Sequence, residues 1–234
     1  MQTVSIPRDR SQVLVNDFVR SVYNWMALGL GLTGIVAFYV AHSEPLLKFI
    51  FGNQLMFWGL IIGELVLVFS ISGRITKMSA QTATGLFLLY SALNGATLSF
   101  IFIVYSGASV ARVFFITAGT FAVCSVYGMT TKRDLTSVGG FLFMGLVGII
   151  IASLVNLFIK SSAMTMIISY IGVIVFVGLT AYDTQRIKEM ALSRPAGLAS
   201  DAQRKGAILG ALSLYLDFIN LFLMMLRIFG GSRD

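Results

Sequence analysis

Charged residues are scarce in this chain. Of its 234 residues, 12% are Asp, Glu, Lys or Arg, whereas 57% are hydrophobic. A soluble domain of ordinary composition carries about 25% charged residues. The scarcity argues against a soluble enzyme or a soluble binding domain, and indicates an integral membrane protein with little soluble mass.

Cysteine, histidine and proline are also rare. Cys124 is the single cysteine, so no intramolecular disulfide can form and no cysteine-based metal motif exists. His42 is the single histidine, and we expect a solvated residue at the end of the first apolar run, with a pH sensor as the alternative. None of the three prolines lies inside an apolar run, which excludes a proline kink as a gate.

Seven apolar runs divide the chain, each of about 20 residues and therefore long enough to cross a bilayer as a helix. We predict spans at about residues 22–41, 55–73, 85–105, 112–129, 138–159, 164–184 and 201–229. The first run is too long for a typical signal-peptide core and is read as an uncleaved helix, cleavage after Ala41 being the alternative. The predicted fold class is all-α: a seven-transmembrane-helix bundle forming a single membrane domain over residues 1–234.

Lys and Arg alternate in number between successive loops. One predicted side holds twelve of the seventeen: Arg8, Arg10, Arg20, Arg74, Lys77, Lys132, Arg133, Arg186, Lys188, Arg194, Arg204 and Lys205. The other side holds five: Lys48, Arg112, Lys160, Arg227 and Arg233. The positive-inside rule then predicts a cytoplasmic N-terminus and an outside C-terminus. Because the basic residues are spread over short loops, the net charge of +7 does not indicate nucleic-acid binding.

Small and polar residues follow one face of the last span. Gly206, Gly210, Ser213, Asp217 and Asn220 are spaced by 4, 3, 4 and 3 residues, which places them on one side of a helix. Small residues allow a neighbouring helix to approach closely. We therefore predict that the last helix lies at the centre of the bundle. Ser213 and Asn220 either support a site on this face or only bridge helices.

Two aspartates lie in consecutive spans, Asp183 at the end of the sixth and Asp217 inside the seventh. Ionisable groups at membrane depth are costly and mark candidate functional sites. Two facing carboxylates cannot easily both ionise, so the pair is expected to share a proton at low pH, and to repel or hold a cation at higher pH. Calcium prefers oxygen ligands, but it takes about six to eight of them, so a site built on two carboxylates is expected to be weak.

The two aspartates differ in apparent depth along their helices. Asp183 lies about 5 Å from Arg186, whereas Asp217 lies about 18 Å from Lys205, at 1.5 Å per residue. They pair only if the sixth helix continues past the lipid, if the seventh begins below it, or if a water-filled entrance reaches the site.

The longest loop is predicted at about residues 185–200. Ser200 followed by Gln203 fits a capping box at which the last helix starts. A helix that starts at Ser200, before the bilayer, favours the second explanation for the pairing, in which the seventh helix begins below the lipid.

A third acid, Glu64, lies in the middle of the second span. It either lines the same pathway as the aspartates or, when protonated, hydrogen-bonds to a neighbouring helix. Asn94 and Asn156, in the third and fifth spans, are expected to join helices rather than bind a ligand.

Two segments resemble the Bax-inhibitor family of membrane proteins. They are residues 180–188, Thr-Ala-Tyr-Asp-Thr-Gln-Arg-Ile-Lys, and residues 211–222, Ala-Leu-Ser-Leu-Tyr-Leu-Asp-Phe-Ile-Asn-Leu-Phe. The number of spans and the chain length agree with the family, so the resemblance covers nearly the whole chain. The short loops and tails look like those of a bacterial member, which implies a multi-pass protein of the bacterial inner membrane.

The resemblance implies a pH-sensitive calcium leak gated at a di-aspartyl pair, here Asp183 and Asp217. It also implies that a glutamate of the second helix, matched by Glu64, belongs to the pathway, and that an arginine of that helix latches onto the sixth-helix aspartate in the closed state. Arg74 is the candidate latch. It follows Glu64 by ten residues rather than the eleven expected, which turns it by roughly 80° on a helix of 3.6 residues per turn.

The leading hypothesis is therefore a proton-regulated cation leak, not an enzyme, with lipid, calcium and protons as its partners and calcium as the only candidate cofactor. One alternative is an interaction protein that restrains a membrane protease or a cell-death pathway. A more remote one is an intramembrane aspartyl protease, because Tyr182 precedes Asp183 as in those enzymes. Their second motif has glycine before the aspartate, however, where this chain has Leu216 before Asp217.

Overall fold

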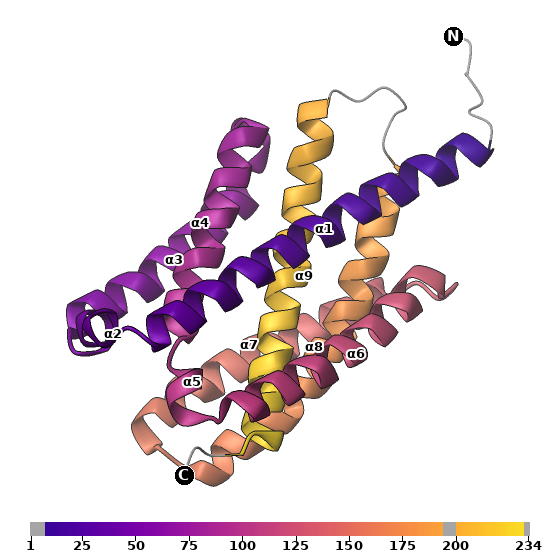
Figure 1. The fold of residues 1–234 in the computed structure, drawn as a ribbon. Helices are drawn as coiled ribbons and strands as arrows, with labels where there is room; N and C mark the ends of the chain where they lie inside the picture. The colour runs from indigo at the N-terminus through magenta and orange to yellow at the C-terminus, as the bar shows by residue number, and fades with distance from the viewer. Residues whose placement is uncertain (1–7, 194–199, 232–234) are drawn as a thin grey trace. The chain divides into compact units, whose positions relative to one another are not determined.

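The computed structural model describes residues 8–193 and 200–231, with side chains from Val15 onward. Helices make up nearly all of this part of the chain (Figure 1). They are α1 Arg8–Ala41, α2 Glu44–Phe51, α3 Gln54–Arg74, the 3₁₀ turn η1 Ile75–Lys77, α4 Ala80–Leu98, α5 Ile101–Val104, α6 Gly107–Thr130, α7 Thr136–Ile159, α8 Ser162–Leu192 and α9 Ser200–Phe229.

Seven stretches of the described chain are long and apolar enough to cross a membrane, judged by length and composition. The third consists of α4 continued by the short α5, residues Ala80–Val104. These stretches confirm the predicted all-α polytopic fold. In α9, 72% of the most apolar window is buried, against 44% or less in each of the others, which agrees with the prediction that the last helix is the most enclosed.

The predicted loop at residues 185–200 is wrong in its first part, because α8 continues to Leu192. Apolar length alone ended the span at residue 184, but the residues that follow are mostly good helix formers, and Ile187 and Ala191 are buried against neighbouring helices. The start of α9 at Ser200 is as predicted. Residues 194–199 lie outside the described part of the chain.

The continuation of α8 bears on the depth of Asp183. The helix runs past Asp183 to Leu192, and α9 starts at Ser200, well before Asp217. Both helices are thus long enough for the first two explanations of the pairing, and which of the three applies stays a prediction.

The connection after α1 also differs from a plain loop, since it contains α2 with Pro45 in its first turn. Proline is tolerated there because the first N–H groups of a helix have no partner within it. His42 lies between α1 and α2 and is exposed, with its Nδ1 2.8 Å from the carbonyl oxygen of Phe38. This is the solvated position expected for it.

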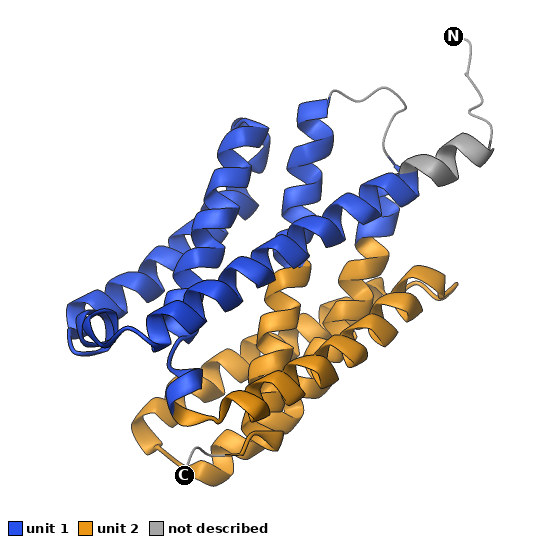
Figure 2. Ribbon diagram, in the orientation of Figure 1, with its two compact units in different colours: residues 1–103, 187–213 blue, residues 104–186, 214–234 orange. Residues whose placement is uncertain are grey.

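The chain divides into two compact units, each made of two separate segments (Figure 2). The first unit is Met1–Ile103 with Ile187–Ser213, and the second is Val104–Arg186 with Leu214–Asp234. Helices α8 and α9 each pass from one unit to the other part-way along their length. The single membrane domain stays a prediction.

In the first unit, α1 and α3 pack against α4. The α1–α4 contact is close because it uses glycine: a Cβ on Gly95 would lie 2.6 Å from the carbonyl oxygen of Thr33. The Thr33 hydroxyl donates to the carbonyl oxygen of Ser91 at 2.8 Å. Gly210 of α9 likewise lies against Val22, which is the close approach predicted for the small-residue face of the last helix.

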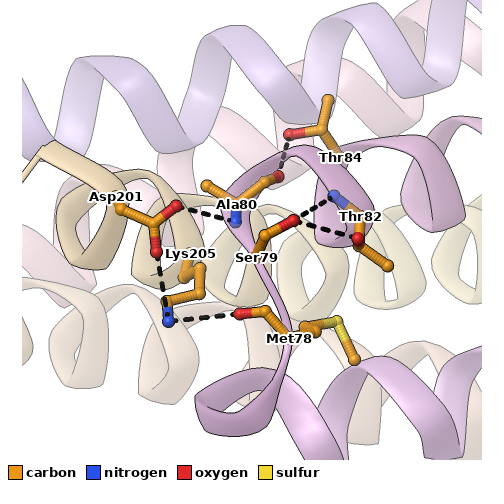
Figure 3. Close-up of polar contacts among 7 residues, drawn as sticks. All are labelled: Met78, Ser79, Ala80, Thr82, Thr84, Asp201 and Lys205. Atoms are coloured by element: carbon orange, nitrogen blue, oxygen red, sulfur yellow. Dashed lines mark hydrogen bonds and ion pairs between the residues drawn. The ribbon is translucent and has the colours of Figure 1, made fainter.

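The start of α9 is bonded to the start of α4 by a group that we name the α4–α9 clamp. It consists of Asp201, Lys205 and the backbone of Met78 and Ala80 (Figure 3). Asp201 Oδ1 accepts a hydrogen bond from the Ala80 N–H at 2.9 Å, and Asp201 Oδ2 pairs with Lys205 at 3.2 Å. Lys205 in turn donates to the Met78 carbonyl oxygen at 3.2 Å. The first N–H groups of a helix need partners from outside it, and here α9 supplies one to α4.

Removal of the Asp201 carboxylate should loosen the start of α4. In Asp201→Ala the Ala80 N–H loses its acceptor, so we expect faster hydrogen exchange at that amide. We expect only a small fall in the melting temperature, because the Asp201 side chain is about half exposed and its ion pair with Lys205 contributes little. Hydrogen exchange with mass spectrometry measures this. The matched control is Glu189→Ala, which removes an exposed acid of the same unit. Equal exchange rates of the Ala80 amide in the two variants would contradict a role for Asp201 in holding α4.

In the second unit, α8 is in close contact with several neighbours through glycine. A Cβ on Gly128 of α6 would clash with the Ala181 carbonyl oxygen, and one on Gly139 of α7 would lie 2.6 Å from the ring of Tyr182. A Cβ on Gly172 would lie 2.8 Å from Met224 of α9. Short distances between helix backbones strengthen van der Waals packing. This matters in a membrane, because lipid tails are as apolar as the side chains and the hydrophobic effect does not drive helices together.

Polar bonds anchor the ends of these helices. Gln185 of α8 accepts from the Leu135 N–H at 2.9 Å and donates to the Arg133 carbonyl oxygen at 2.8 Å, so α8 is held to the α6–α7 connection. At the other end of the unit, the Gly231 N–H, just after α9, donates to the Ser109 hydroxyl near the start of α6 at 2.8 Å.

Candidate functional site

The structure brings Asp183 and Asp217 together within the second unit. Asp183 lies on α8 and is half-buried, whereas Asp217 lies on α9 with 5% of its surface exposed. Their side chains are within hydrogen-bonding reach of each other. Two carboxyl groups this close interact electrostatically, so the protonation of one affects that of the other. The role of the pair as a gate stays a prediction.

Aromatic rings join α9 to α6 in the unit that contains the aspartates. Phe218, the next residue after Asp217, lies with its ring centroid 5.4 Å from those of Phe114 and Phe121 on α6. Phe222, one turn further along, also contacts Phe114. Asp217 itself is buried, and a low local dielectric strengthens the repulsion between two charged carboxylates.

Two buried polar atoms of this unit have no hydrogen-bond partner among the described residues. They are Oδ2 of Asp217 and the hydroxyl oxygen of Ser125 on α6. Such orphans are uncommon in folded proteins, and each one calls for an explanation. Both atoms lie in the second unit.

Glu64 lies in the first unit and is hydrogen-bonded to α4. Thr97 donates to Glu64 Oε1, and the Asn94 amide donates to Glu64 Oε2 at 3.2 Å. The bond to a neighbouring helix agrees with part of the second interpretation, whereas protonation of Glu64 stays a prediction. The same bond shows that Asn94 joins two helices. Asn156 joins the end of α7 to the start of α8 through Thr165 and Ser161. A place for Glu64 on the ion pathway stays a prediction.

The remaining predicted residues are less directly placed. Arg74 ends α3, is exposed and belongs to the first unit, as does the half-buried Ser213, so the latch stays a prediction. Asn220 lies one turn after Asp217, and its amide N–H donates to the Leu216 carbonyl oxygen of its own helix at 2.8 Å. Its support of the pair also stays a prediction.

The acidic site is a pair rather than a metal cluster. Among the described residues, no group of three or more His, Cys, Asp or Glu side chains is close enough to hold a metal ion. Calcium, if it passes here, is cargo that meets two carboxylates and must find its other oxygens elsewhere. The weak calcium site stays a prediction.

Ser125 was not among the predicted site residues. Thr117, Phe121, Ser125 and Gly128 follow α6 at spacings of 4, 4 and 3 residues and are all buried, so they share one face. The spacing resembles that of the polar face of the last helix. This face of α6 is hard to recognise in the sequence, because Phe121 is a large apolar residue among the small and polar ones.

Comparison with known proteins settles the family. A family model described as inhibitor of apoptosis-promoting Bax1 matches residues 15–234. The chain belongs to the Bax-inhibitor family. This membership confirms the resemblance drawn from residues 180–188 and 211–222.

Relatives of this Bax-inhibitor family member cover nearly its full length. Inner membrane protein YbhL of Escherichia coli (strain K12) is 55% identical over 216 residues, 92% of each chain. An uncharacterized protein of Borreliella burgdorferi is 45% identical over 234 residues, 99% of each chain. An uncharacterized membrane protein of Streptococcus pyogenes serotype M6 is 40% identical over 225 residues, 95% of this chain and 96% of the relative. With the seven apolar helices, these relatives support a multi-pass membrane protein.

Proposed function

We propose that this Bax-inhibitor family member is a pH-sensitive calcium leak channel of the bacterial inner membrane, gated by protonation of Asp183 and Asp217. The observation that carries the proposal is the pair of carboxyl groups within hydrogen-bonding reach of each other, with Asp217 buried on α9. The relative named as an inner membrane protein supports the location.

The pair can act as a switch because its charge depends on the number of protons it holds. With one shared proton it carries one negative charge, and with two it is neutral. In the family, an arginine of the second helix holds the sixth-helix aspartate in the closed state, and Arg74 is the candidate here. Uptake of the second proton removes the charge that such an arginine needs, so the channel opens as the pH falls.

A weak site suits a leak. Conduction needs a site that attracts the ion without retaining it. The pair offers at most four of the about six to eight oxygens that calcium prefers, and it loses charge as it takes up protons, so it does not retain the ion. Calcium therefore passes as cargo and is not stored.

Calcium entry into liposomes that contain the purified full chain tests the proposal. We expect entry above that of empty liposomes, rising as the pH falls from about 8 to about 6, as the pair takes up its second proton. Calcium entry that rises as the pH increases would overturn the arginine latch. Repulsion between the two carboxylates would then be the opening force. No entry at any pH would overturn the channel and favour the interaction protein.

A further inference from the structure

Gln185 of α8 is a buried amide whose two polar atoms both bond to the backbone of another element. Only 7% of the residue is exposed. Its Oε1 accepts from the Leu135 N–H at 2.9 Å, and its Nε2 donates to the Arg133 carbonyl oxygen at 2.8 Å. Both partners lie in the short connection between α6, which ends at Thr130, and α7, which begins at Thr136. Because a hydrogen bond weakens steeply when its angle is wrong, these bonds fix the direction of the side chain as well as its distance.

The residues beside Gln185 on α8 also face α6 and α7. Ala181 and Thr184 lie against a glycine of α6, and Tyr182 lies against a glycine of α7. A helix turns by about 100° per residue, so these four residues together cover an arc of about 160°. Asp183 lies on the opposite side of the helix, at least about 100° from each of them. One side of α8 is thus held by α6 and α7, and the other side carries the aspartate.

Asp183 therefore faces away from α6 and α7, and it is within hydrogen-bonding reach of Asp217 on α9. The rotation of α8 about its own axis decides whether this reach is kept. A side chain ends about 5 Å from the axis of its helix, so a turn of about 20° moves its carboxyl group by about 2 Å. A hydrogen bond does not survive a shift of this size. The groups that set the rotation of α8 thus set the interaction between the two aspartates.

Among these groups, Gln185 supplies the directional bonds. The glycine contacts allow the helices to approach closely, whereas hydrogen bonds to a fixed backbone also select one orientation. We propose that Gln185 is a positioning residue for the di-aspartyl pair: its two bonds to the α6–α7 connection hold α8 at the rotation that turns Asp183 toward Asp217. The inference deepens the proposed function and rests on it only for the transport measurement.

A change at Gln185 leaves the charged groups around this part of α8 in place. These groups are Lys132, Arg133 and Asp134 in the α6–α7 connection, and Arg186, Lys188 and Glu189 on α8. Helix α7 contains no charged residue, and the one in α6 is Arg112, near the start of that helix, whereas the connection follows its end. The buried titratable groups Cys124 of α6 and Tyr215 of α9 are likewise unchanged. A shift in the titration of the pair can therefore be assigned to the position of Asp183.

The test compares Gln185→Met with Asn156→Leu. Each replaces an amide by an apolar side chain of similar size. Asn156, near the end of α7, donates to Thr165 near the start of α8 at 2.8 Å, and Thr165 lies about 27 Å along α8 from Asp183. Two readouts are taken on the full chain in liposomes: the pH profile of calcium entry, and the infrared titration of the carboxyl stretches that change in Asp217→Asn. The second readout does not depend on transport.

Two interacting carboxyl groups titrate in two steps, and the separation between the steps reflects the strength of their interaction. In Gln185→Met α8 is free to turn, so the separation should fall by about one pH unit. The step in which the pair takes up its second proton should then move to higher pH, and the midpoint of calcium entry should move with it. Asn156→Leu should leave both steps and the midpoint of calcium entry in place.

An unchanged separation in Gln185→Met, or an equal change in both variants, would overturn the positioning role. Absence of calcium entry in the wild type would overturn the proposed function alone, because the infrared steps still decide whether Gln185 acts on the pair. If Gln185→Met does not fold, Gln185→Asn takes its place. Its amide is shorter by one methylene group and cannot reach both partners, so the separation between the steps should fall in this variant as well.

Discussion

Asp217→Asn should abolish the pH dependence of calcium entry. The wild-type rate should change by at most about tenfold per pH unit, the limit for one titrating group. The amide that replaces the carboxyl group cannot take up a proton, so the pair loses the site of its second proton. We therefore expect a low, flat profile in the liposome assay. A variant with the wild-type profile would exclude the pair as the pH sensor.

Asp134→Asn is the matched control. It neutralises an exposed acid of the same unit, in the connection between α6 and α7. Hydrogen bonds from Thr136 hold the pKa of Asp134 below its ordinary value. A lowered carboxyl pKa means that Asp134 is already ionised well below pH 6 and gains no proton over the assay range. The control should keep the wild-type dependence on pH.

Gly128→Ala should destabilise the protein by about 1–3 kcal/mol, the usual cost of forcing an extra methyl group into a packed interface. The new Cβ would clash with the Ala181 carbonyl oxygen and lie 3.0 Å from Cβ of Thr184. A backbone carbonyl cannot move aside without moving α8, so α6 and α8 must separate. Unfolding in mixed micelles with increasing SDS measures the change in the free energy of unfolding.

Gly119→Ala on the same helix is the comparison. No atom lies within 4 Å of a Cβ at this position, and alanine is the better helix former by about 1 kcal/mol. The variant should be as stable as the wild type or more so. Equal losses of unfolding free energy in Gly119→Ala and Gly128→Ala would mean that α6 does not tolerate alanine at either position. The α6–α8 contact would then not be the cause.

The spans were predictable because the length of an apolar run decides whether a helix can cross a bilayer. The ends of the helices were not. The last turns of α8 are held by good helix formers and by the burial of Ile187, and neither property contributes to an apolar run.

The site was predictable in part. Asp183 and Asp217 are conspicuous because acids are costly in apolar runs, and the structure brings them together. Gln185 is not conspicuous, since its partners are backbone atoms 50 and 52 residues away. The contact between Asp201 and Ala80 joins residues 121 positions apart, and no pattern along the chain indicates such a pair.

The anchoring of α9 has a consequence for how a change at its middle is transmitted. The helix is tied near its start by the Asp201 bond to the Ala80 amide, and just past its end by the Gly231 amide bond to Ser109. The first bond lies within the first unit and the second within the second unit. Hydrogen exchange at the amides of Ala80 and Gly231 therefore reports separately on whether a change at Asp217, such as Asp217→Asn, loosens either end of the helix.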